Sequence, residues 1–298
     1  MVIADMAPSV VAEVPAFTQL FAAKATPVQL AKGHVWLEGP VWLPAGVFIC
    51  SDIGANTMFR FDGTTLVVWR TPSGQANGNT LDTEGRLITC QHAPHAVQRT
   101  EHDGSTTMLV DSFEQKPLNS PNDVVVKSDG SIWFTDPTYG LNGRQSQQAV
   151  CRVYRLDPLT RVLTAVCDTC EQPNGLCFSP DEKQLYIADS GLPHHVLVCS
   201  VNEGQSLGPT RLFATISPGV PDGIRCDPSG RLWVCAGDGV HVYAPDGSLL
   251  GRILLHSVVS NCCFGGKDGR TLYMTSIGNL WSMTLATNMA AKSAGHPP

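Results

Sequence analysis

The chain has 298 residues, with 20 Lys and Arg against 26 Asp and Glu, which gives a formal net charge of −6 at pH 7. Nucleic-acid binding is not expected, because it requires clustered Lys and Arg to neutralise phosphates. Charged residues make up only 15% of the chain and hydrophobic residues 43%, with 28 Gly and 21 Pro. Such a composition is typical of a β-rich globular protein and excludes extensive disorder.

The sequence contains no signal for a membrane or for secretion. No apolar run reaches the roughly 20 residues needed to cross a bilayer, and residues 1–16 lack the basic start of a secretory signal. Most of the 11 Cys lie in apolar runs without regular spacing. We therefore expect free thiols and a reducing, cytoplasmic location. Cys167 and Cys170 form a CxxC pair, but without a second pair or nearby His residues it does not predict a zinc site.

Only the two ends of the chain suggest anything other than β-structure. Residues 1–29 are expected to form an N-terminal extension, in which 15–21 could be a short helix, and residues 284–298 a frayed tail rich in small residues. Between them, residues 30–283 alternate short β-branched, aromatic and Leu runs with Asp-Gly, Ser-Gly, Glu-Gly and Asp-Pro turns. This alternation predicts one large all-β domain.

The β-runs repeat. Each unit has a polar residue that opens an apolar strand, then a tight turn and a second strand, and most units show two further strands. The opening residues are Glu38, Asn79, Asn122, Asn174, Asp222 and Asn261. Their spacings of 41, 43, 52, 48 and 39 residues average about 45. A repeat of this length built from strands and turns predicts a six-bladed β-propeller.

In a propeller the first strand of each blade lines the central channel, so the six opening residues should meet near one end of it. All six offer a side-chain oxygen, and Glu38 and Asp222 carry charges that would balance one divalent cation. Oxygen ligands favour Ca²⁺, with Mg²⁺, Mn²⁺ or Zn²⁺ as alternatives. The competing interpretation is that Asn174-Gly175 and Asp222-Gly223 are ordinary turn pairs. It explains less well why the same position is polar in all six units.

These motifs carry a family resemblance. The chain resembles the SMP-30/gluconolactonase/LRE family of regucalcin-like lactonases from about residue 30 to 283, and its bacterial gluconolactonase branch most closely. The matching motifs are EGPVW at 38–42, SPND at 120–123, FTDP at 134–137, YG at 139–140, PNGL at 173–176 and PDG at 221–223. The resemblance implies a six-bladed propeller with an axial divalent metal held by Glu38, Asn122, Asn174 and Asp222. Animal members carry a basic residue where this chain has Ser120.

The predicted site suits hydrolysis of a sugar lactone. A cation would polarise the lactone carbonyl, and Asp222 or Glu38 would take the proton of the attacking water, with the resemblance favouring Asp222. Candidate substrate-lining residues are Asn79, His92, Asp136, Tyr139 and Asn261, although His92 could equally be an ordinary loop residue. A promiscuous metal-dependent esterase or phosphotriesterase, and a non-catalytic propeller that binds a ligand or protein, remain alternatives. The oligomeric state is left open.

Overall fold

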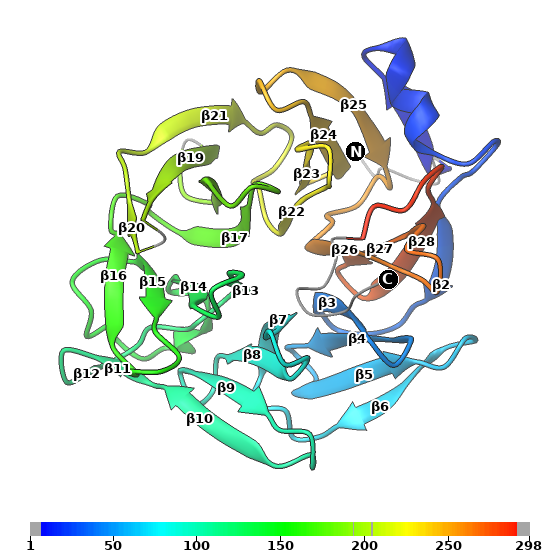
Figure 1. Ribbon diagram of the computed structural model, residues 1–298. Coiled ribbons are helices and arrows are strands. Elements are labelled where there is room, and N and C mark those ends of the chain that lie inside the picture. Colours follow the sequence, from blue (N-terminus) through cyan, green and yellow to red (C-terminus); the bar gives the residue numbers. More distant parts are fainter. Residues whose placement is uncertain (1–6, 193, 204, 291–298) are drawn as a thin grey trace.

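The computed structural model describes residues 7–192, 194–203 and 205–290 of the chain. Its antiparallel sheets are arranged radially around one axis and form a six-bladed β-propeller (Figure 1). The predicted fold class is therefore confirmed. Within each blade the strands follow one another from the axis outward, so the first strand of every repeat lies innermost, as predicted.

The first three blades each consist of four consecutive strands. In blade 1 these are β3 (Leu37–Leu43), β4 (Val47–Asp52), β5 (Thr57–Phe61) and β6 (Leu66–Arg70). In blade 2 they are β7 (Ala76–Leu81), β8 (Leu87–Gln91), β9 (Ala96–Thr100) and β10 (Thr106–Val110). In blade 3 they are β13 (Val124–Val126), β14 (Ile132–Asp136), β15 (Arg152–Leu156) and β16 (Leu163–Cys167). The connections contain the hairpin β11 (Ser112–Phe113) and β12 (Lys116–Pro117), and the short 3-10 helix η2 (Tyr139–Leu141).

The other three blades carry additions to this plan. Blade 4 comprises β17 (Pro173–Phe178), β18 (Gln184–Asp189), β19 (His195–Asn202) and β21 (Arg211–Thr215), with β20 (Ser206–Leu207) on the end of β19. Blade 5 comprises β22 (Ile224–Cys226), β23 (Leu232–Cys235), β24 (Gly239–Tyr243), β25 (Leu249–Leu254) and a fifth strand, β1 (Ser9–Ala12). Blade 6 comprises β26 (Asn261–Gly265), β27 (Thr271–Ser276), β28 (Asn279–Thr284) and β2 (Val28–Ala31).

Two strands of the N-terminal segment, β1 and β2, join blades of the propeller, and both begin within the predicted extension over 1–29. Strand β2 runs antiparallel to β28, with Val28 opposite Ser282, so the two ends of the chain close the ring within blade 6 (Figure 1). Strand β1 likewise pairs with β25. In both pairings the partner strand lies more than 200 residues away in the chain. Local sequence patterns therefore cannot predict them. The predicted helix is present as the 3-10 helix η1 (Pro15–Leu20).

The C-terminal segment is also packed as far as the structure describes it. Leu285 forms a bridge with Phe21, and Met289 is buried in the core cluster that contains Phe17 and Trp233. The prediction of a frayed tail is thus wrong for residues 284–290, because these apolar side chains fill the space beside blades 5 and 6. Residues 291–298 of the predicted tail lie outside the described residues.

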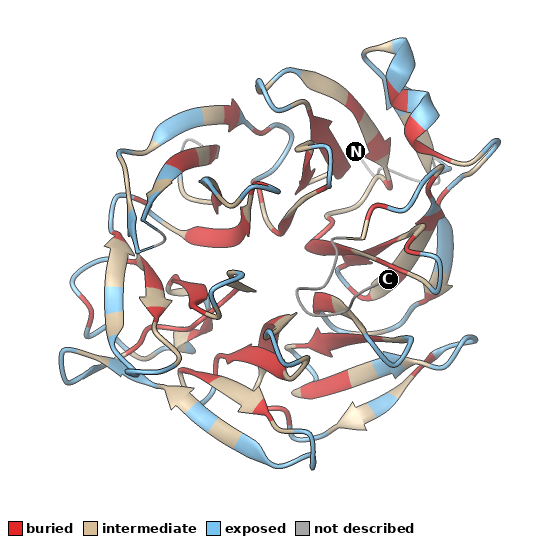
Figure 2. Cartoon of the chain, in the orientation of Figure 1, coloured by how far each residue is buried: buried red, intermediate tan, exposed pale blue. Residues whose placement is uncertain are grey.

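The core lies between neighbouring blades. Blade 2 contributes Ile88 and Cys90, and blade 3 contributes Val124 and Phe134, to one continuous apolar cluster. Middle strands such as β8 and β14 are buried along their whole length, whereas the residues of outer strands such as β10 are partly or fully exposed (Figure 2). Each fully buried aliphatic side chain stabilises the fold by about 1.5–3 kcal/mol, so the propeller is a rigid frame for residues at its axis. In the described part of the chain, no helix is long and apolar enough to cross a membrane.

Candidate functional site

The inner strands begin with residues that touch the next blade through the backbone. The Gly78 N–H donates to the Asn122 carbonyl over 2.8 Å, and the Gly223 N–H donates to the Ser260 carbonyl over 2.7 Å. A Cβ on Gly39 would lie only 2.0 Å from the Asn77 carbonyl oxygen. Glycine follows the opening residue in four blades because a side chain there would collide with the next blade. This contact defines the equivalent opening positions as Glu38, Asn77, Asn122, Asn174, Asp222 and Ser260.

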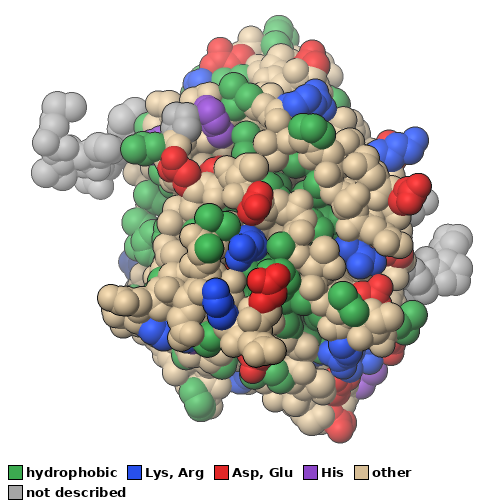
Figure 3. Space-filling model, turned by 90° about the vertical axis from the view of Figure 1, so that its left-hand side faces the viewer, with side chains coloured by type: hydrophobic (Ala, Val, Ile, Leu, Met, Phe, Trp, Pro, Cys, Tyr) green, Lys and Arg blue, Asp and Glu red, His purple; other side chains and the backbone are tan. Residues whose placement is uncertain are grey.

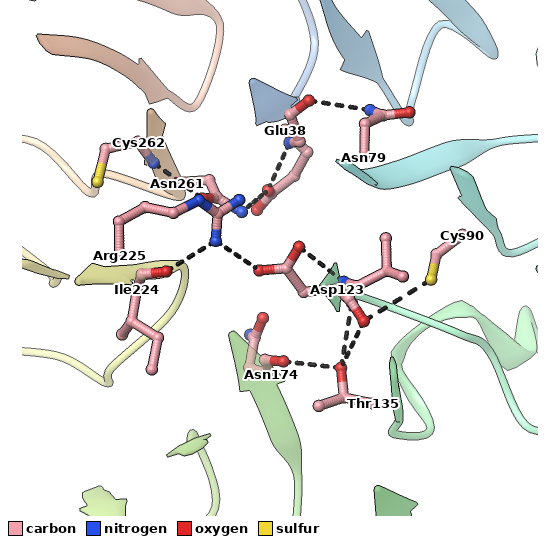
Figure 4. Close-up of polar contacts among 12 residues, drawn as sticks. Glu38, Asn79, Cys90, Asp123, Thr135, Asn174, Ile224, Arg225, Asn261 and Cys262 are labelled. Carbon is pink, nitrogen blue, oxygen red and sulfur yellow. Dashed lines mark hydrogen bonds and ion pairs between the residues drawn. The ribbon is translucent and has the colours of Figure 1, made fainter. Parts of the chain in front are cut away.

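Asn79, the predicted opening residue of blade 2, lies two positions beyond the axial ring. Its Nδ2 donates to the Gly39 and Asn77 carbonyls and to Ser51 Oγ, each over 2.9 Å, and its Oδ1 accepts from Thr89 Oγ1. Its side chain therefore joins blades 1 and 2 (Figure 4). The strand pairing gives the register: Ala76 pairs with Gln91 as Leu37 pairs with Asp52, so the counterpart of Glu38 in blade 2 is Asn77 and not Asn79.

Asn261, the predicted opening residue of blade 6, lies one position beyond the ring but still reaches the site. Its Nδ2 donates to Glu38 Oε2 over 3.3 Å, while its Oδ1 accepts from the Cys262 N–H over 2.9 Å. The same Glu38 oxygen also accepts from the Gly39 N–H. Asn261 thus orients the Glu38 carboxylate.

The four residues that the resemblance assigned to metal binding all open inner strands. Glu38, Asn122 and Asn174 are buried, and Asp222 is partly exposed. Figure 4 shows the Glu38 and Asn174 side chains directed toward one central space from blades 1 and 4. Asn174 Nδ2 donates to Ser190 Oγ over 3.2 Å, which leaves its Oδ1 for another partner.

The axial space contains an ion pair that the sequence interpretation did not include. Arg225 Nη1 of blade 5 lies 3.2 Å from Asp123 Oδ2 of blade 3, and Asp123 is 1% exposed (Figure 4). Asp123 follows Asn122, at the position that is glycine in four other blades. That departure from the repeat was a signal available in the sequence. For Arg225, in contrast, the repeat offered no such signal.

Three carboxylates and one guanidinium therefore share the site, a net charge of −2 when all are ionised. Desolvation raises the pKa of Glu38 to about 7, and the Asp123 carboxylate adds to the rise. Desolvation and the Glu38 and Asp123 carboxylates raise the pKa of Asp222 well above its ordinary value. The carboxylates thus repel one another, and an additional positive charge would relieve that repulsion.

The acidic residues at the ends of the second strands form a different set. Asp136 is fully buried, and its two oxygens accept the N–H groups of Asn119 and Ser120 over 2.9 and 2.8 Å. Desolvation raises its pKa to about 7, against the effect of these hydrogen bonds. Asp52 and Asp189 likewise accept backbone N–H groups from the segment that precedes their own inner strand. Asp136, predicted to line the substrate site, instead fixes the loop that leads to Asn122.

His92 and Tyr139 lie beside the axial ring. His92 is buried, with its Nε2 3.1 Å from Asn77 Nδ2, and burial, together with His95, lowers its pKa to about 4. Tyr139 is 48% exposed and lies near Ser190 and Asp222. Desolvation raises the pKa of its hydroxyl to about 12. Tyr139 therefore occupies the mouth of the site, whereas His92 lies beneath the surface.

Surface charge and cysteine chemistry outside the axis can be compared with the axial site over the described residues. On the side of the molecule in Figure 3, basic and acidic side chains are interspersed and neither sign forms a continuous patch. All 11 cysteines are free thiols, and the Sγ atoms of Cys167 and Cys170 are 3.9 Å apart. Within the described ranges, no three His, Cys, Asp or Glu side chains alone form a metal-binding group. The axial set differs because amide oxygens complete it.

Known proteins share this architecture and sequence. A sequence model described as "SMP-30/Gluconolactonase/LRE-like region" matches residues 36–278. The gluconolactonase of Zymomonas mobilis is 31% identical over 288 residues, covering 86% of this chain and 80% of that protein. A crystal structure of a gluconolactonase from Xanthomonas campestris has a TM-score of 0.88 and 33% identity, covering 94% of this chain and 96% of that one. A putative gluconolactonase has a TM-score of 0.91 and 38% identity, covering 95% of this chain and all of that one.

Proposed function

The chain belongs to the SMP-30/gluconolactonase/LRE-like family, and from that premise we propose that it is a metal-dependent hydrolase of sugar lactones. Lactone hydrolysis, the cleavage of a cyclic carboxylic ester, is the activity for which its relatives are named. The gluconolactonases support a six-membered aldonolactone as substrate, and the 29% identical L-arabinolactonase of Azospirillum brasilense supports a wider range of sugar lactones.

The observation that carries the proposal is the meeting of Glu38, Asp222 and Asp123 with a single guanidinium, Arg225, on the propeller axis. Arg225 neutralises one of the three carboxylates, which leaves the charge that one divalent cation balances. Carboxylate and amide oxygens are the donors that Ca²⁺ prefers, and Mg²⁺ or Mn²⁺ would also suit them. Burial and neighbouring carboxylates raise the pKa values of Glu38 and Asp222, and a cation between them would favour their ionised forms. The donor set thus fits the metal that the family implies.

The residues that would hold the cation are Glu38, Asn122, Asn174 and Asp222. When bound, a divalent cation supplies a Lewis acid for the lactone carbonyl oxygen and for water. Asn261 keeps the Glu38 carboxylate oriented by donating to Oε2, and Ser190 holds Asn174 by accepting from Nδ2. These hydrogen bonds restrict the side chains before substrate arrives, which is the condition for electrostatic stabilisation of an oxyanion.

Asp222 is the proposed proton acceptor for the attacking water. Of the carboxylates on the axis it is the more exposed, since Glu38 and Asp123 are buried. It therefore faces the side from which water and lactone enter. Tyr139 beside it is placed to contact the sugar hydroxyls.

The surroundings support a small-molecule enzyme of a reducing compartment. The net charge of −6 and the interspersed surface charges argue against nucleic acid as a partner (Figure 3). The 11 free thiols agree with a cytoplasmic location.

A substrate panel tests the proposal. The purified protein is assayed with glucono-, galactono- and arabinolactones, with aryl esters and with phosphotriesters, after EDTA treatment and after addition of Ca²⁺, Mg²⁺ or Mn²⁺. We expect hydrolysis of sugar lactones, loss of activity with EDTA and recovery with a divalent cation. Unchanged lactonase activity in EDTA would refute the metal dependence. Activity on esters or phosphotriesters alone would replace the proposed substrate class, and no turnover on the panel would point to a binding protein.

A further inference from the structure

We propose that Asn77, oriented by His92, supplies a fifth oxygen donor from blade 2 to the axial cation site. The inference rests on the proposed function, because it concerns the same cation. It adds a residue that the motif-based assignment of Glu38, Asn122, Asn174 and Asp222 leaves out.

The strand register places Asn77 in the axial ring. Ala76 pairs with Gln91 at the end of β8, just as Leu37 pairs with Asp52 in blade 1 and Pro173 with Asp189 in blade 4. The next residue in each strand is Asn77, Glu38 and Asn174. Because strand position fixes the direction of a side chain relative to its sheet, Asn77 projects as Glu38 and Asn174 do.

The side-chain oxygen of Asn77, Oδ1, has no hydrogen-bond donor among the described residues. Asn77 is 2% exposed, and its Oδ1 is buried without a hydrogen-bond partner in the described part of the chain. A buried acceptor without a hydrogen bond lowers the free energy of unfolding by about 1–3 kcal/mol, and such groups are uncommon in folded proteins. Asn79, on the same strand, has partners for both ends of its amide. Strand β7 can therefore satisfy a buried amide fully, and the amide of Asn77 is the one on this strand whose oxygen has no partner among the described residues.

A cation fits this acceptor better than a substrate hydroxyl does. The Oδ1 atom is almost fully buried, which leaves little room for a sugar hydroxyl. A Ca²⁺ ion lies 2.3–2.6 Å from its oxygen ligands and needs less room. Ca²⁺ also takes six to eight oxygens, so Glu38, Asp222, Asn122 and Asn174 leave room for a further donor.

His92 determines which end of the amide faces the site. Its Nε2 lies 3.1 Å from Asn77 Nδ2, and an amide nitrogen can only donate, so Nε2 accepts. The backbone of His92 is fixed by donation to the Gln75 carbonyl. Its ring packs against Gly140 of η2, where a Cβ would lie 2.3 Å from His92 Cγ. The imidazole is thus a fixed acceptor that keeps Nδ2 away from the cation and Oδ1 toward it, which makes His92 a positioning residue.

The test is calorimetric titration of cation-free protein with CaCl₂, supported by the shift in melting temperature that Ca²⁺ produces. We expect Asn77→Ala and His92→Leu each to raise the Kd for Ca²⁺ by about 10-fold or more, the size of effect seen when groups around a metal are removed. A matched control is Asn79→Ala, which removes a buried amide from the same strand. It should lower the melting temperature of the cation-free protein but leave the Kd within about twofold.

A double substitution separates orientation from simple damage. A carboxylate has two equivalent oxygens and needs no orienting partner. We therefore expect Asn77→Asp to bind Ca²⁺ at least as tightly as the wild type, and addition of His92→Leu to that variant to change the Kd by less than about twofold. Weaker binding by Asn77→Asp would overturn the proposal even if Asn77→Ala failed to fold.

Two further results count against the inference. If Asn77→Ala binds Ca²⁺ as tightly as the wild type, Asn77 is not a ligand, while the proposed function stands. If His92→Leu weakens Ca²⁺ binding by the same factor in the wild type and in the Asn77→Asp variant, His92 does not act through the Asn77 amide. A wild-type protein that shows no binding of Ca²⁺, Mg²⁺ or Mn²⁺ would overturn both this inference and the metal dependence, and the wild-type titration alone reveals that case.

Discussion

Two sets of acidic side chains lie near the same end of the propeller and are used in opposite ways. At the ends of the second strands, Asp52, Asp136 and Asp189 each accept two or more backbone N–H groups. At the starts of the inner strands, Glu38 accepts one backbone N–H, from Gly39, and neighbouring carboxylates contribute to the raised pKa values of Glu38 and Asp222. Burial raises the pKa of Asp136 as well, so the comparison teaches that nearby carboxylates, more than residue type or burial, distinguish the axial acids from the loop-fixing ones.

The sharpest test of this distinction is Asp222→Asn. The substitution removes the proposed proton acceptor, so we expect kcat/KM for the preferred lactone to fall by about 10³-fold. It also removes one of three mutually repelling carboxylates, so the melting temperature in EDTA should stay the same or rise. Enzyme assays and thermal unfolding of the same preparation measure both effects. A variant that loses stability but keeps its activity would place Asp222 with the loop-fixing acids.

The axial ion pair gives the next largest effect. Arg225→Met leaves Asp123 buried without its counter-charge, and breaking a buried pair in this way costs about 3–5 kcal/mol of unfolding free energy. The double variant Arg225→Met/Asp123→Asn should recover most of that loss, because no unpaired charge remains. Urea unfolding in EDTA provides the measurement. A loss below about 1 kcal/mol in the single variant would mean that the pair is dispensable to the fold.

A loop-fixing acid should affect stability much more than chemistry. Asp189→Ala removes the acceptor of the Glu171, Gln172 and Gly191 N–H groups, with an expected loss of about 3 kcal/mol. The control is Asp168→Ala, since Asp168 is exposed and its loss should change stability by less than about 0.5 kcal/mol. Urea unfolding compares the two variants. Equal stabilities would contradict the role assigned to the second-strand acids.

The pH dependence of the unfolding free energy tests the loop-fixing acid Asp136. Asp136 has a pKa of about 7 in the folded protein, above its ordinary 3.8. The folded state therefore binds this proton more tightly than the unfolded chain, and the stabilisation is complete below pH 4 and lost as the pH rises through 7. The stability advantage of wild type over Asp136→Asn should shrink between pH 5 and 7, by at most about 1.4 kcal/mol per pH unit. Urea unfolding at several pH values measures it, and a constant difference would contradict the raised pKa.

The blade repeat could be predicted from the sequence because the same local pattern of opening polar residue, strand and turn recurs in every blade. The sequence was insufficient where the geometry depends on distant partners, as in the pairing of β2 with β28. In blade 2, Asn77-Gly78-Asn79 offered two amides, and only the pairing of Ala76 with Gln91 shows that the first one is the counterpart of Glu38. Asp136 was expected to line the site because it ends a second strand near the same face, but its oxygens accept the N–H groups of Asn119 and Ser120, 17 and 16 residues earlier. Hydrogen bonds of that span are not visible in a motif.

Substitution of Tyr139 should change catalysis least, because Tyr139 lies at the mouth of the site and not on the axis. Its ring is 48% exposed and its hydroxyl lies near Ser190 and Asp222. In Tyr139→Phe the ring remains and only one hydroxyl contact to the sugar is lost, so we expect KM to rise a few-fold, about 1 kcal/mol, with kcat nearly unchanged. Steady-state kinetics on a polar sugar lactone and on an unsubstituted lactone of the same ring size separate the two constants, and only the sugar lactone should be affected. A 100-fold fall in kcat on both substrates would instead place this hydroxyl in the chemical step beside Asp222.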